Sequence, residues 1–518
     1  MYNFGYVSLY AVYLILFSLA VRRVVTCAQD WQFSKRHGCK PAQSVARVRE
    51  PFLGIDHLLE ALRKARAGRF VRFSASRYAR YGNTHMTRRA LFETAHTIEP
   101  ENLKYMLATG FDQFRLATMR VRAMVPLFGS GIFTTDGPAW AHSRAILRPS
   151  FTRQNMAPLL AMMERHFQML LRQVPRDGAP FDMQRLFFCF TMDTATEFLM
   201  GGSTHTLDPE HRSDAEKAFA DDYLACCLEA VRQIAMGPLQ RFSITPRHIP
   251  ATCQRAFAYV DEFVDKALAL RSARKAAAGA AVGAGAGAEY NFIEELAGMT
   301  TDRTLLRDQV LSVLLASRDT TAALLSNLFY ELARHPAVYA KLRNEIHTHL
   351  PTGELPTEAA MNAMPYLRWC INEALRLYPV VPCNTREAAC DTALPLGGGP
   401  DGRSPLFIKK GTPVLYNVYA MHRRTDIYGD DANAFRPERW DGLRPGWGFL
   451  PFNGGPRVCL GQQFALTEAS YVITRMLQCF DSMQPKDFSP WAELYSLVMT
   501  SKNGVIVSMT PAASSIAA

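Results

Sequence analysis

The chain has 518 residues, of which 48% are hydrophobic and 20% are charged, and its formal net charge is +11. This composition excludes a globally disordered chain and permits a large buried core. The eleven cysteines contain no C-x-x-C pair and no framework spacing, which favours a reducing compartment over a disulfide scaffold. Because no basic run with interleaved aromatic residues is present, we expect no nucleic-acid partner.

The first segment has the composition of a membrane anchor. Residues 1–21 contain no charged side chain, and Arg22 and Arg23 follow directly. As a helix, about 20 residues span roughly 30 Å, the thickness of a bilayer core. A cleaved leader is disfavoured because no positive region precedes the segment and no small-residue cleavage site follows it. We predict an anchor over residues 1–30 with the remaining chain in the cytoplasm; an interfacial helix is the alternative.

The next informative segment covers residues 134–149. The turn-forming sequence at 135–138, Thr-Asp-Gly-Pro, predicts the start of a helix. Trp140 and Arg144 stand at i and i+4, so they share a face of that helix. An indole N–H and a guanidinium on one face can hold a carboxylate between them, whereas ordinary surface packing is the alternative.

The middle of the chain carries little recognisable chemistry. Residues 155–270 are mostly apolar at helical spacing, which predicts several packed helices. Residues 272–290 are dominated by alanine and glycine without a periodic polar face. This composition predicts a flexible surface insert rather than a site.

A long apolar helix is predicted from Leu305 to Leu332, and a polar run from Ser317 to Ala322 interrupts it. Polar groups inside a buried helix are costly unless they have partners or a chemical role. The carboxylate of Asp319 beside the hydroxyl of Thr320 can relay protons. A capped or solvated kink is the alternative interpretation.

Glu373 and Arg376 stand at i and i+3 on one face of the next predicted helix. With Arg439 as a bidentate partner they would form a buried ionic cluster, to which we assign a structural role rather than a catalytic one. The glycine-rich and proline-rich run at 396–405 predicts a hairpin, and an extended segment should follow at 412–419.

The most specific pattern is F-x-x-G-x-R-x-C-x-G, formed by Phe452, Gly455, Arg457, Cys459 and Gly461. Glycines allow a sharp turn and close approach to a flat ligand. A cysteine thiolate bound to haem iron favours cleavage of an O–O bond, and a nearby arginine can pair with a haem propionate. We therefore predict that Cys459 is the axial ligand of a haem iron, and the alternative is a buried structural cysteine.

These motifs, in this order, resemble those of the cytochrome P450 superfamily over roughly residues 50 to 510. The cysteine loop is similar to its haem-binding signature, Glu373 to Arg376 is similar to its E-x-x-R helix, and 316–321 is similar to its oxygen-activating stretch. The resemblance implies a mainly α fold with small β-sheets. Residues 31–518 would form a helix-rich triangular catalytic domain with haem between the long central helix and the cysteine loop, and residues 1–30 a transmembrane helix.

The resemblance also implies roles for individual residues. Thr320 would hold the hydrogen-bond network at the bound oxygen, and Asp319 would supply it with protons. The haem site would be formed by Cys459, Trp140, Arg144, Arg386, Arg457, Phe452, Gly455 and Gly461. The substrate would be lined by Ala316, Val380, Val381, Asn384, Leu497 and Val498. Ser317 stands where many relatives have glycine, and Ala316 stands where some have a haem-esterifying glutamate, so covalent haem attachment is not expected.

The resemblance implies a monooxygenase with haem b that uses O2 and electrons from NADPH through a separate cytochrome P450 reductase. Cytochrome b5 is a further candidate donor, and the basic net charge would suit either a solvated surface or a docking face for an acidic donor. The expected location is the endoplasmic reticulum membrane, and the expected substrate is an apolar small molecule.

Within the superfamily, the segments at 384–388, 397–402, 419–424 and 451–468 resemble the fungal alkane and fatty-acid hydroxylase branch. This resemblance implies terminal hydroxylation of long aliphatic chains. The alternatives are a fungal monooxygenase of secondary metabolites or aromatic xenobiotics, a reductase-independent isomerase or dehydratase, and a non-catalytic haem-binding protein.

Overall fold

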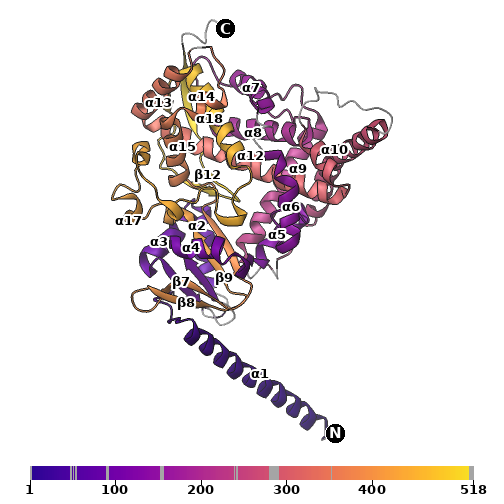
Figure 1. Ribbon diagram of the computed structural model, residues 1–518, viewed down its shortest axis with the longest axis vertical. Coiled ribbons are helices and arrows are strands. Elements are labelled where there is room, and N and C mark those ends of the chain that lie inside the picture. Colours follow the sequence, from indigo (N-terminus) through magenta and orange to yellow (C-terminus); the bar gives the residue numbers. More distant parts are fainter. Residues whose placement is uncertain are drawn as a thin grey trace. The chain divides into compact units, whose positions relative to one another are not determined.

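The computed structural model describes residues 3–46, 49–50, 52, 55–88, 93–151, 157–237, 240, 243–278, 291–351 and 353–512. The chain is mainly helical with small β-sheets (Figure 1), which confirms the predicted class. Its internal packing divides it into two compact units. The first contains Met1–Asp56, Ser76–Arg115 and Thr385–Tyr416, and the second contains His57–Ala75, Leu116–Asn384 and Asn417–Ala518.

The first unit is built around a six-stranded sheet with the order β1-β2-β3-β9-β6-β4. Pairing is parallel between β1 and β2 and between β3 and β9, and antiparallel between β2 and β3, where His85 faces His96. The strands are β1 (Val45–Ala46), β2 (Thr84–Arg88), β3 (Glu93–Thr97), β4 (Phe114–Leu116), β6 (Cys383–Ala388) and β9 (Pro413–Asn417). The unit boundary passes through the ends of β4, β6 and β9.

The hairpin predicted around 396–405 is present as β7 (Thr392–Gly398) and β8 (Ser404–Ile408), which pair in antiparallel fashion. Its turn closes through a hydrogen bond from the N–H of Gly402 to the carbonyl of Gly399. Both glycines have positive φ, a conformation that other residues adopt only under strain. The same unit contains α4 (Pro100–Lys104), a π-helical turn (Tyr105–Thr109) and a 3-10 turn (Phe111–Gln113).

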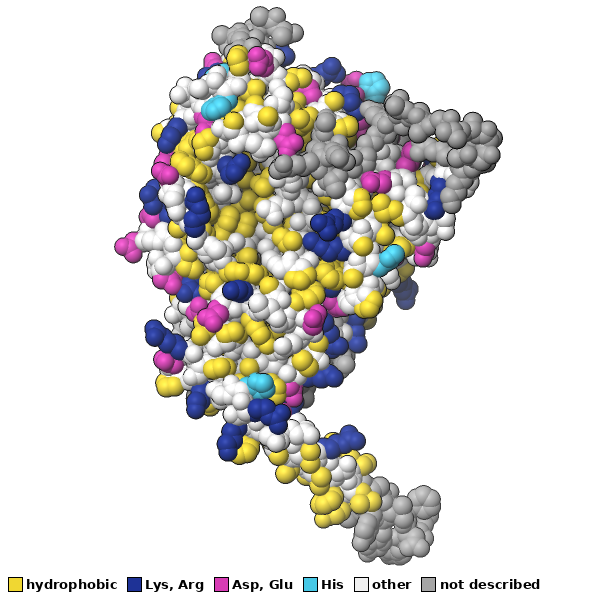
Figure 2. Space-filling view, in the orientation of Figure 1, with side chains coloured by type: hydrophobic (Ala, Val, Ile, Leu, Met, Phe, Trp, Pro, Cys, Tyr) yellow, Lys and Arg dark blue, Asp and Glu magenta, His cyan; other side chains and the backbone are white. Residues whose placement is uncertain are grey.

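The predicted anchor lies within α1 (Asn3–Arg36), a single helix. Apolar side chains share its described part with basic ones (Figure 2), and the large apolar side chains between Tyr13 and Val25 are exposed. Among the residues whose positions are described, no helix combines the length and the apolar character required to cross a membrane. The transmembrane anchor therefore stays a prediction.

The second unit holds most of the helices. They are α5 (Thr118–Phe128), α6 (Gly137–Leu147), α7 (Ala157–Arg172), α8 (Met183–Met200), α9 (Asp214–Ala235), α10 (Ile249–Ala278), α11 (Phe292–Met299), α12 (Arg303–Arg334), α13 (Pro336–His349), α14 (Glu358–Asn362), α15 (Pro365–Leu377), α16 (Val418–Met421), α17 (Thr425–Tyr428) and α18 (Gln462–Cys479). The unit boundary crosses α2 (Ile55–Arg66) and α3 (Phe70–Tyr81).

Short strands complete the second unit in two small sheets. One has the order β10-β13-β5 and the other pairs β11 with β12. Their bounds are β5 (Phe181–Asp182), β10 (Phe480–Pro485), β11 (Glu493–Tyr495), β12 (Met499–Ser501) and β13 (Ile506–Pro511).

The central helix predicted from Leu305 is α12, and it contributes to two separate hydrophobic clusters. Its first half, from Leu306 to Leu315, packs into a cluster with α8, α9 and α10. Its second half, from Ala322 onward, packs into another cluster with α13, α15 and α18. The polar run predicted from sequence therefore falls where the helix passes from one core to the other.

The Ala/Gly-rich insert is only partly described. Helix α10 continues through Ala278, so residues 272–278 are helical rather than part of a flexible linker. Alanine is the strongest helix former, which explains the continuation. Residues 279–290 lie outside the described part of the chain.

Candidate functional site

The cysteine loop has a defined backbone geometry. The N–H of Cys459 donates to the carbonyl of Phe452 at 3.0 Å, and the N–H of Val458 donates to that of Gly455 at 3.0 Å. Gly455 has a φ of 67°, which explains the need for glycine at this motif position. Gly461 is the N-cap of α18, so the cysteine precedes the positive end of an 18-residue helix.

The thiol of Cys459 keeps an exposed surface within this turn. Loss of water around it raises the pKa of the thiol, whereas the backbone N–H of Gly461 and the positive charge of Arg144 act in the opposite direction. These two groups stabilise the thiolate, which is the form that binds a metal. The loop therefore presents an accessible sulfur with groups placed to support its negative charge.

Helix α6 connects the cysteine loop to α12. It begins after Asp136 with Pro138 in its first turn, which confirms the predicted turn and helix. Arg144 donates from Nη1 to the carbonyl of Val458 at 3.0 Å, next to Cys459. The neighbouring Ser143 accepts a hydrogen bond from Gln309 of α12 at 2.9 Å. The cysteine loop, α6 and α12 are thus joined by direct contacts.

Arg457 and Trp140 are also brought together. The guanidinium of Arg457 lies 4.3 Å from the centre of the Trp140 ring and donates to the carbonyl of Thr135 at 3.0 Å. Arg457 additionally pairs with Asp136 at the start of α6. The sequence predicted the turn that contains Asp136 but indicated no partner for its side chain. The role of Trp140, Arg144 and Arg457 toward a propionate stays a prediction.

The polar run of α12 contains the partly exposed residues in the otherwise buried middle of this helix. Between Asp308 and Ala333, only 316–318 and 320 are not buried. Ala316, Ser317 and Thr320 lie at i, i+1 and i+4, which places them on neighbouring parts of one helix face. The hydroxyl of Thr320 donates to the carbonyl of Ala316, and that of Ser317 donates to Val313 at 2.9 Å.

Asp319 is buried and poorly satisfied. Its Oδ1 lies 3.1 Å from Nη1 of Arg318, but within the described part of the chain neither atom has a hydrogen bond of acceptable geometry. Burial raises the pKa of Asp319, and the charge of Arg318 only partly opposes this. A carboxyl group in this state exchanges a proton more readily near neutral pH than an exposed aspartate does.

Sequence reasoning missed Glu468, a buried carboxyl group on α18. Its Oε1 accepts a hydrogen bond from Thr194 of α8 at 2.8 Å. Burial raises its pKa to about 7, although the hydroxyls of Thr194 and Thr321 act to lower it. The signal was present in the sequence, because Glu468 lies close before the apolar run Tyr471–Ile473 on the helix that follows the cysteine.

Several predicted substrate residues lie in the second unit. The N–H of Met499 donates to the carbonyl of Val380 at 3.0 Å, which brings Val498 close to Val380 in the fold. Val380 and Val498 are buried, Leu497 and Ala316 are partly buried, and Val381 is exposed. Asn384 accepts a hydrogen bond from Arg120 of α5 at 3.2 Å.

Arg386 belongs to the first unit and is almost fully buried. Its Nη1 donates a hydrogen bond to the carbonyl of Thr385 at 3.2 Å. Within the described residues the guanidinium has no carboxylate partner. A buried guanidinium is costly without an anion. This environment suits a residue that binds an anionic group of a ligand.

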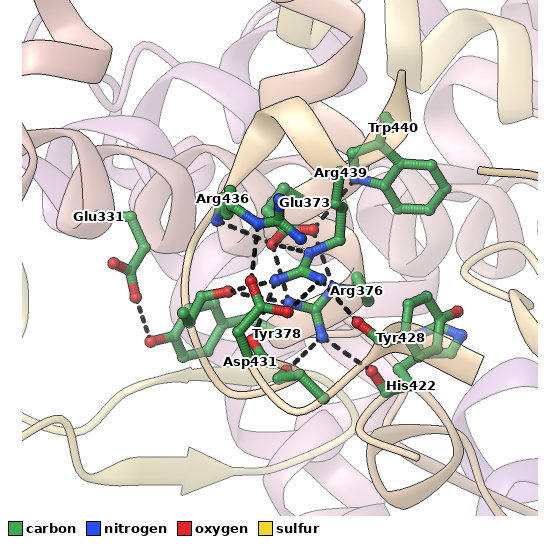
Figure 3. Close-up of polar contacts among 12 residues, drawn as sticks. Glu331, Glu373, Arg376, Tyr378, His422, Tyr428, Asp431, Arg436, Arg439 and Trp440 are labelled. Atoms are coloured by element: carbon green, nitrogen blue, oxygen red, sulfur yellow. Dashed lines mark hydrogen bonds and ion pairs between the residues drawn. The ribbon is translucent and has the colours of Figure 1, made fainter. Parts of the chain in front are cut away.

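The predicted ionic cluster is fully enclosed (Figure 3). Arg376 donates from Nε and Nη2 to the two carboxylate oxygens of Glu373, both at 2.8 Å. Glu373 also accepts from Nε of Arg439 at 2.8 Å and from the indole N–H of Trp440 at 3.1 Å. The side chains of Glu373 and Arg376 are 0% exposed. The cluster joins α15 to the segment before the cysteine loop. Its carboxylate and guanidinium groups form hydrogen bonds with one another.

Comparison with known proteins identifies the family. The family model described as Cytochrome P450 matches residues 60–507. The chain is 42% identical to cytochrome P450 monooxygenase FPY7 of Fusarium mangiferae, covering 97% of this chain and 95% of the relative. It is 40% identical to cytochrome P450 52A3-B of Candida maltosa, covering 88% and 89%, and 42% identical to cytochrome P450 52A12 of Debaryomyces hansenii, covering 88% of each. The chain belongs to the cytochrome P450 family and is a monooxygenase of that family.

Members of this family use haem and O2 with electrons from a redox partner, and the residues described above fit such a group. Cys459, an exposed residue, would hold the iron through its sulfur. When bound, thiolate-ligated haem supplies the binding and cleavage of O2. Around the sulfur, the N–H of Gly461 and the positive charge of Arg144 favour the thiolate form. Thr320 lies on the partly exposed stretch of α12, next to the buried Asp319.

Proposed function

We propose that this monooxygenase hydroxylates the terminal carbon of long alkanes or fatty acids. The observation that carries the proposal is the accessible stretch of α12, where the hydroxyls of Ser317 and Thr320 and the carboxyl of Asp319 stand between two apolar cores. A proton-handling group beside an apolar environment suits oxidation of a hydrocarbon, because the substrate needs a dry site and the oxygen chemistry needs protons.

In this proposal Asp319 and Thr320 have complementary tasks. Burial raises the pKa of Asp319, so its carboxyl group accepts a proton more readily than an exposed aspartate does. Thr320 presents a hydroxyl that can accept a hydrogen bond while donating to Ala316. Together they would deliver protons to the oxygen site without opening it to bulk water.

The substrate assignment rests on the side chains proposed to line the pocket. Of the six, Ala316, Val380, Val381, Leu497 and Val498 are aliphatic and form no side-chain hydrogen bond, and only Asn384 is polar. Such a lining favours a hydrocarbon through apolar burial rather than through directional recognition. The sequence segments that resemble the fungal alkane and fatty-acid hydroxylase branch agree with this choice.

Arg120 offers a way to distinguish fatty acids from alkanes as substrates. Its guanidinium reaches Asn384, which is one of the proposed lining residues. A positive group at this position would pair with the carboxylate of a fatty acid and would add nothing to the binding of an alkane. We expect Arg120→Gln to raise KM for a fatty acid at least about tenfold and to leave an alkane unaffected.

A second candidate function is oxidation of a fungal secondary metabolite. The relatives FPY7 and fsdH of Fusarium species are 42% identical to this chain, and himC of Aspergillus japonicus is 40% identical. Five cytochromes P450 52 of Candida and Debaryomyces are 38% to 42% identical to this chain, so overall identity does not place them ahead of the other relatives. The aliphatic lining is what places hydrocarbons first.

We further propose that the enzyme is held in the endoplasmic reticulum membrane by residues 1–30 and receives its electrons from an NADPH-linked reductase, with cytochrome b5 as an additional donor. The uncharged N-terminal segment followed by Arg22 and Arg23, and the exposed apolar side chains of α1, support this. Fractionation of cells that express the full chain tests the location, and loss of membrane association on deletion of residues 1–30 tests the anchor.

The activity is tested in microsomes that contain the full chain and an NADPH-linked reductase. Dodecane, dodecanoic acid and an aromatic compound such as coumarin are compared for binding-induced spectral shifts and for NADPH-dependent products. Terminal alcohols from the aliphatic substrates support the proposal. Selective oxidation of the aromatic compound, or product from Cys459→Ala, would overturn it.

A further inference from the structure

Two cysteines distant from Cys459 form a close pair. Cys226 on α9 and Cys253 on α10 have their sulfur atoms 2.8 Å apart. Both residues are buried, with 2% and 4% of their surface exposed, and neither is part of a disulfide bond. The monooxygenase chemistry described above does not use either of them.

The packing of α9 against α10 holds this pair in register. Phe219 stacks on Tyr259 with ring centres 4.3 Å apart, and Asp222 makes a two-point ion pair with Arg255 at 2.6 and 2.7 Å. Residue numbers along this series of contacts rise on α9 and fall on α10. The contacts and the cysteine pair therefore belong to one antiparallel interface. The aromatic stack and the ion pair hold α9 and α10 in one alignment, and this alignment brings the two thiols together.

A cavity of about 230 Å³ gives access to the pair. Both cysteines line it, together with Arg122 and Leu127 of α5 and Glu229 of α9. A water molecule occupies about 30 Å³ in the liquid, so a cavity of this size admits small polar molecules. The sulfurs are thus shielded from large reagents but adjacent to space that a small oxidant can enter.

The two thiols are chemically different. Either sulfur can donate its S–H to the other. When Cys226 donates, this hydrogen bond lowers the pKa of Cys253 and raises that of Cys226. Because the thiolate is the nucleophile in thiol chemistry, Cys253 is the residue that reacts first. Cys226 then lies within reach as the resolving thiol.

We propose that Cys226 and Cys253 form a peroxide-sensitive dithiol whose oxidation creates a disulfide bond between α9 and α10. The thiolate of Cys253 attacks hydrogen peroxide, giving a sulfenic acid as the O–O bond breaks and hydroxide leaves. The sulfur of Cys226 then displaces water as its proton is lost, so that two thiols and one peroxide yield one disulfide and two waters. The sulfurs must approach by about 0.7 Å to reach the bonded distance of about 2.05 Å.

This site is a modification site beyond the monooxygenase activity and the proposed substrate. In a reducing compartment the pair would rest as thiols and oxidise transiently. The disulfide would add a covalent link to an interface already held by the Phe219–Tyr259 stack and the Asp222–Arg255 ion pair. A reducing thiol restores the original state.

The test uses the haem-loaded full chain treated with hydrogen peroxide, then alkylated without reduction and digested with trypsin. We expect peptide 218–232 to be linked to peptide 248–255, and the link to disappear after treatment with dithiothreitol. Alkylation of Cys226 and Cys253 at the untreated level, or a sulfinic acid on Cys253 without a link, would overturn the proposal. The ferrous carbon monoxide spectrum is recorded throughout to verify that the haem site is intact.

Because Cys227 lies in the same peptide as Cys226, it provides the matched control. Cys227 is also buried, but the sulfur that lies 2.8 Å from Cys253 is that of Cys226. Cys227→Ala should retain the linked peptides, whereas Cys226→Ser and Cys253→Ser should each lose them while keeping the carbon monoxide spectrum. A link that survives Cys226→Ser, or one that is lost in Cys227→Ala, would show that the pairing is not the one proposed.

Discussion

Two groups of charged side chains lie in the interior of the second unit, and they differ in how well they are satisfied. Around Glu373, every carboxylate oxygen accepts hydrogen bonds from arginine, tryptophan or backbone donors. Around Asp319, the nearest cation is Arg318, and the contact lacks hydrogen-bond geometry within the described chain. The first arrangement holds structure together, whereas the second leaves a carboxyl group available for proton transfer.

The difference has a simple physical basis. A buried charge whose partners are all in place gains nothing by changing protonation, so it is stable and chemically inert. A buried carboxyl group with few partners has a raised pKa and holds its proton more readily than an exposed one does. Satisfaction of hydrogen bonds, rather than burial alone, therefore distinguishes structural charges from functional ones.

The largest expected effect is on the Glu373 cluster. Glu373→Gln leaves Arg376 and Arg439 buried without an anion, and breaking such a pair costs about 3–5 kcal/mol. We expect a large loss of folded, carbon monoxide-binding protein and a lower thermal unfolding midpoint. The matched control is Lys341→Gln, which removes an ion pair with Glu438 in which the lysine is 54% exposed, and it should cost about 1 kcal/mol or less. Equal losses in the two variants would contradict the comparison.

The second prediction concerns the proton-handling residues. Asp319→Asn and Thr320→Ala should each lower product formation about 100-fold at unchanged stability, because general acid-base groups contribute on that scale. Product formed per NADPH consumed is the measurement. Ser326→Ala is the control, since Ser326 lies on the same helix and donates to the carbonyl four residues earlier at 2.6 Å. If Ser326→Ala reduces turnover as much as Thr320→Ala does, the loss of turnover arises from altered helix packing and not from proton transfer.

The third prediction concerns Glu468, a buried carboxyl group with fewer partners than Glu373. Burial raises its pKa from 4.5 to about 7, so the folded state holds a proton that the unfolded state releases. Stability from this group is full below pH 4.5 and is lost as the pH rises through 7, a loss of about 3 kcal/mol. In Glu468→Gln, thermal unfolding midpoints between pH 5 and 8 should fall less with pH than in the wild type. Parallel pH profiles would show that another group is responsible.

The smallest effect is expected at Ser317. Ser317→Gly removes a hydrogen bond to the carbonyl of Val313 and adds backbone freedom, at a cost of about 1 kcal/mol in unfolding free energy. Turnover of a linear substrate should change less than tenfold, because Asp319 and Thr320 are retained. Turnover and thermal unfolding of the variant are compared with those of Thr320→Ala, and equal losses of turnover would assign Ser317 a catalytic role.

Much of the site could be predicted because its chemistry requires particular residues at particular spacings. Cys459 with its flanking glycines, the Asp319–Thr320 pair and the Glu373–Arg376 spacing are all local patterns in the chain. The helix after Pro138 and the β7–β8 hairpin follow equally from turn residues. In each case the physical constraint acts over a few residues, so the sequence alone contains it.

Other features arise from tertiary contacts between distant segments. The partner of Arg457 is Asp136, the carbonyl beside Cys459 is held by Arg144, and Glu468 meets Thr194 across two helices. The pairing of Cys226 with Cys253 likewise exists only because α9 and α10 pack in one register. By itself, the sequence determined the family and the positions of the polar residues, and it predicted Cys459 as the haem ligand. Only the tertiary structure decided which buried charges are satisfied and which thiols meet, because hydrogen bonds and burial depend on side chains that the chain order does not bring together.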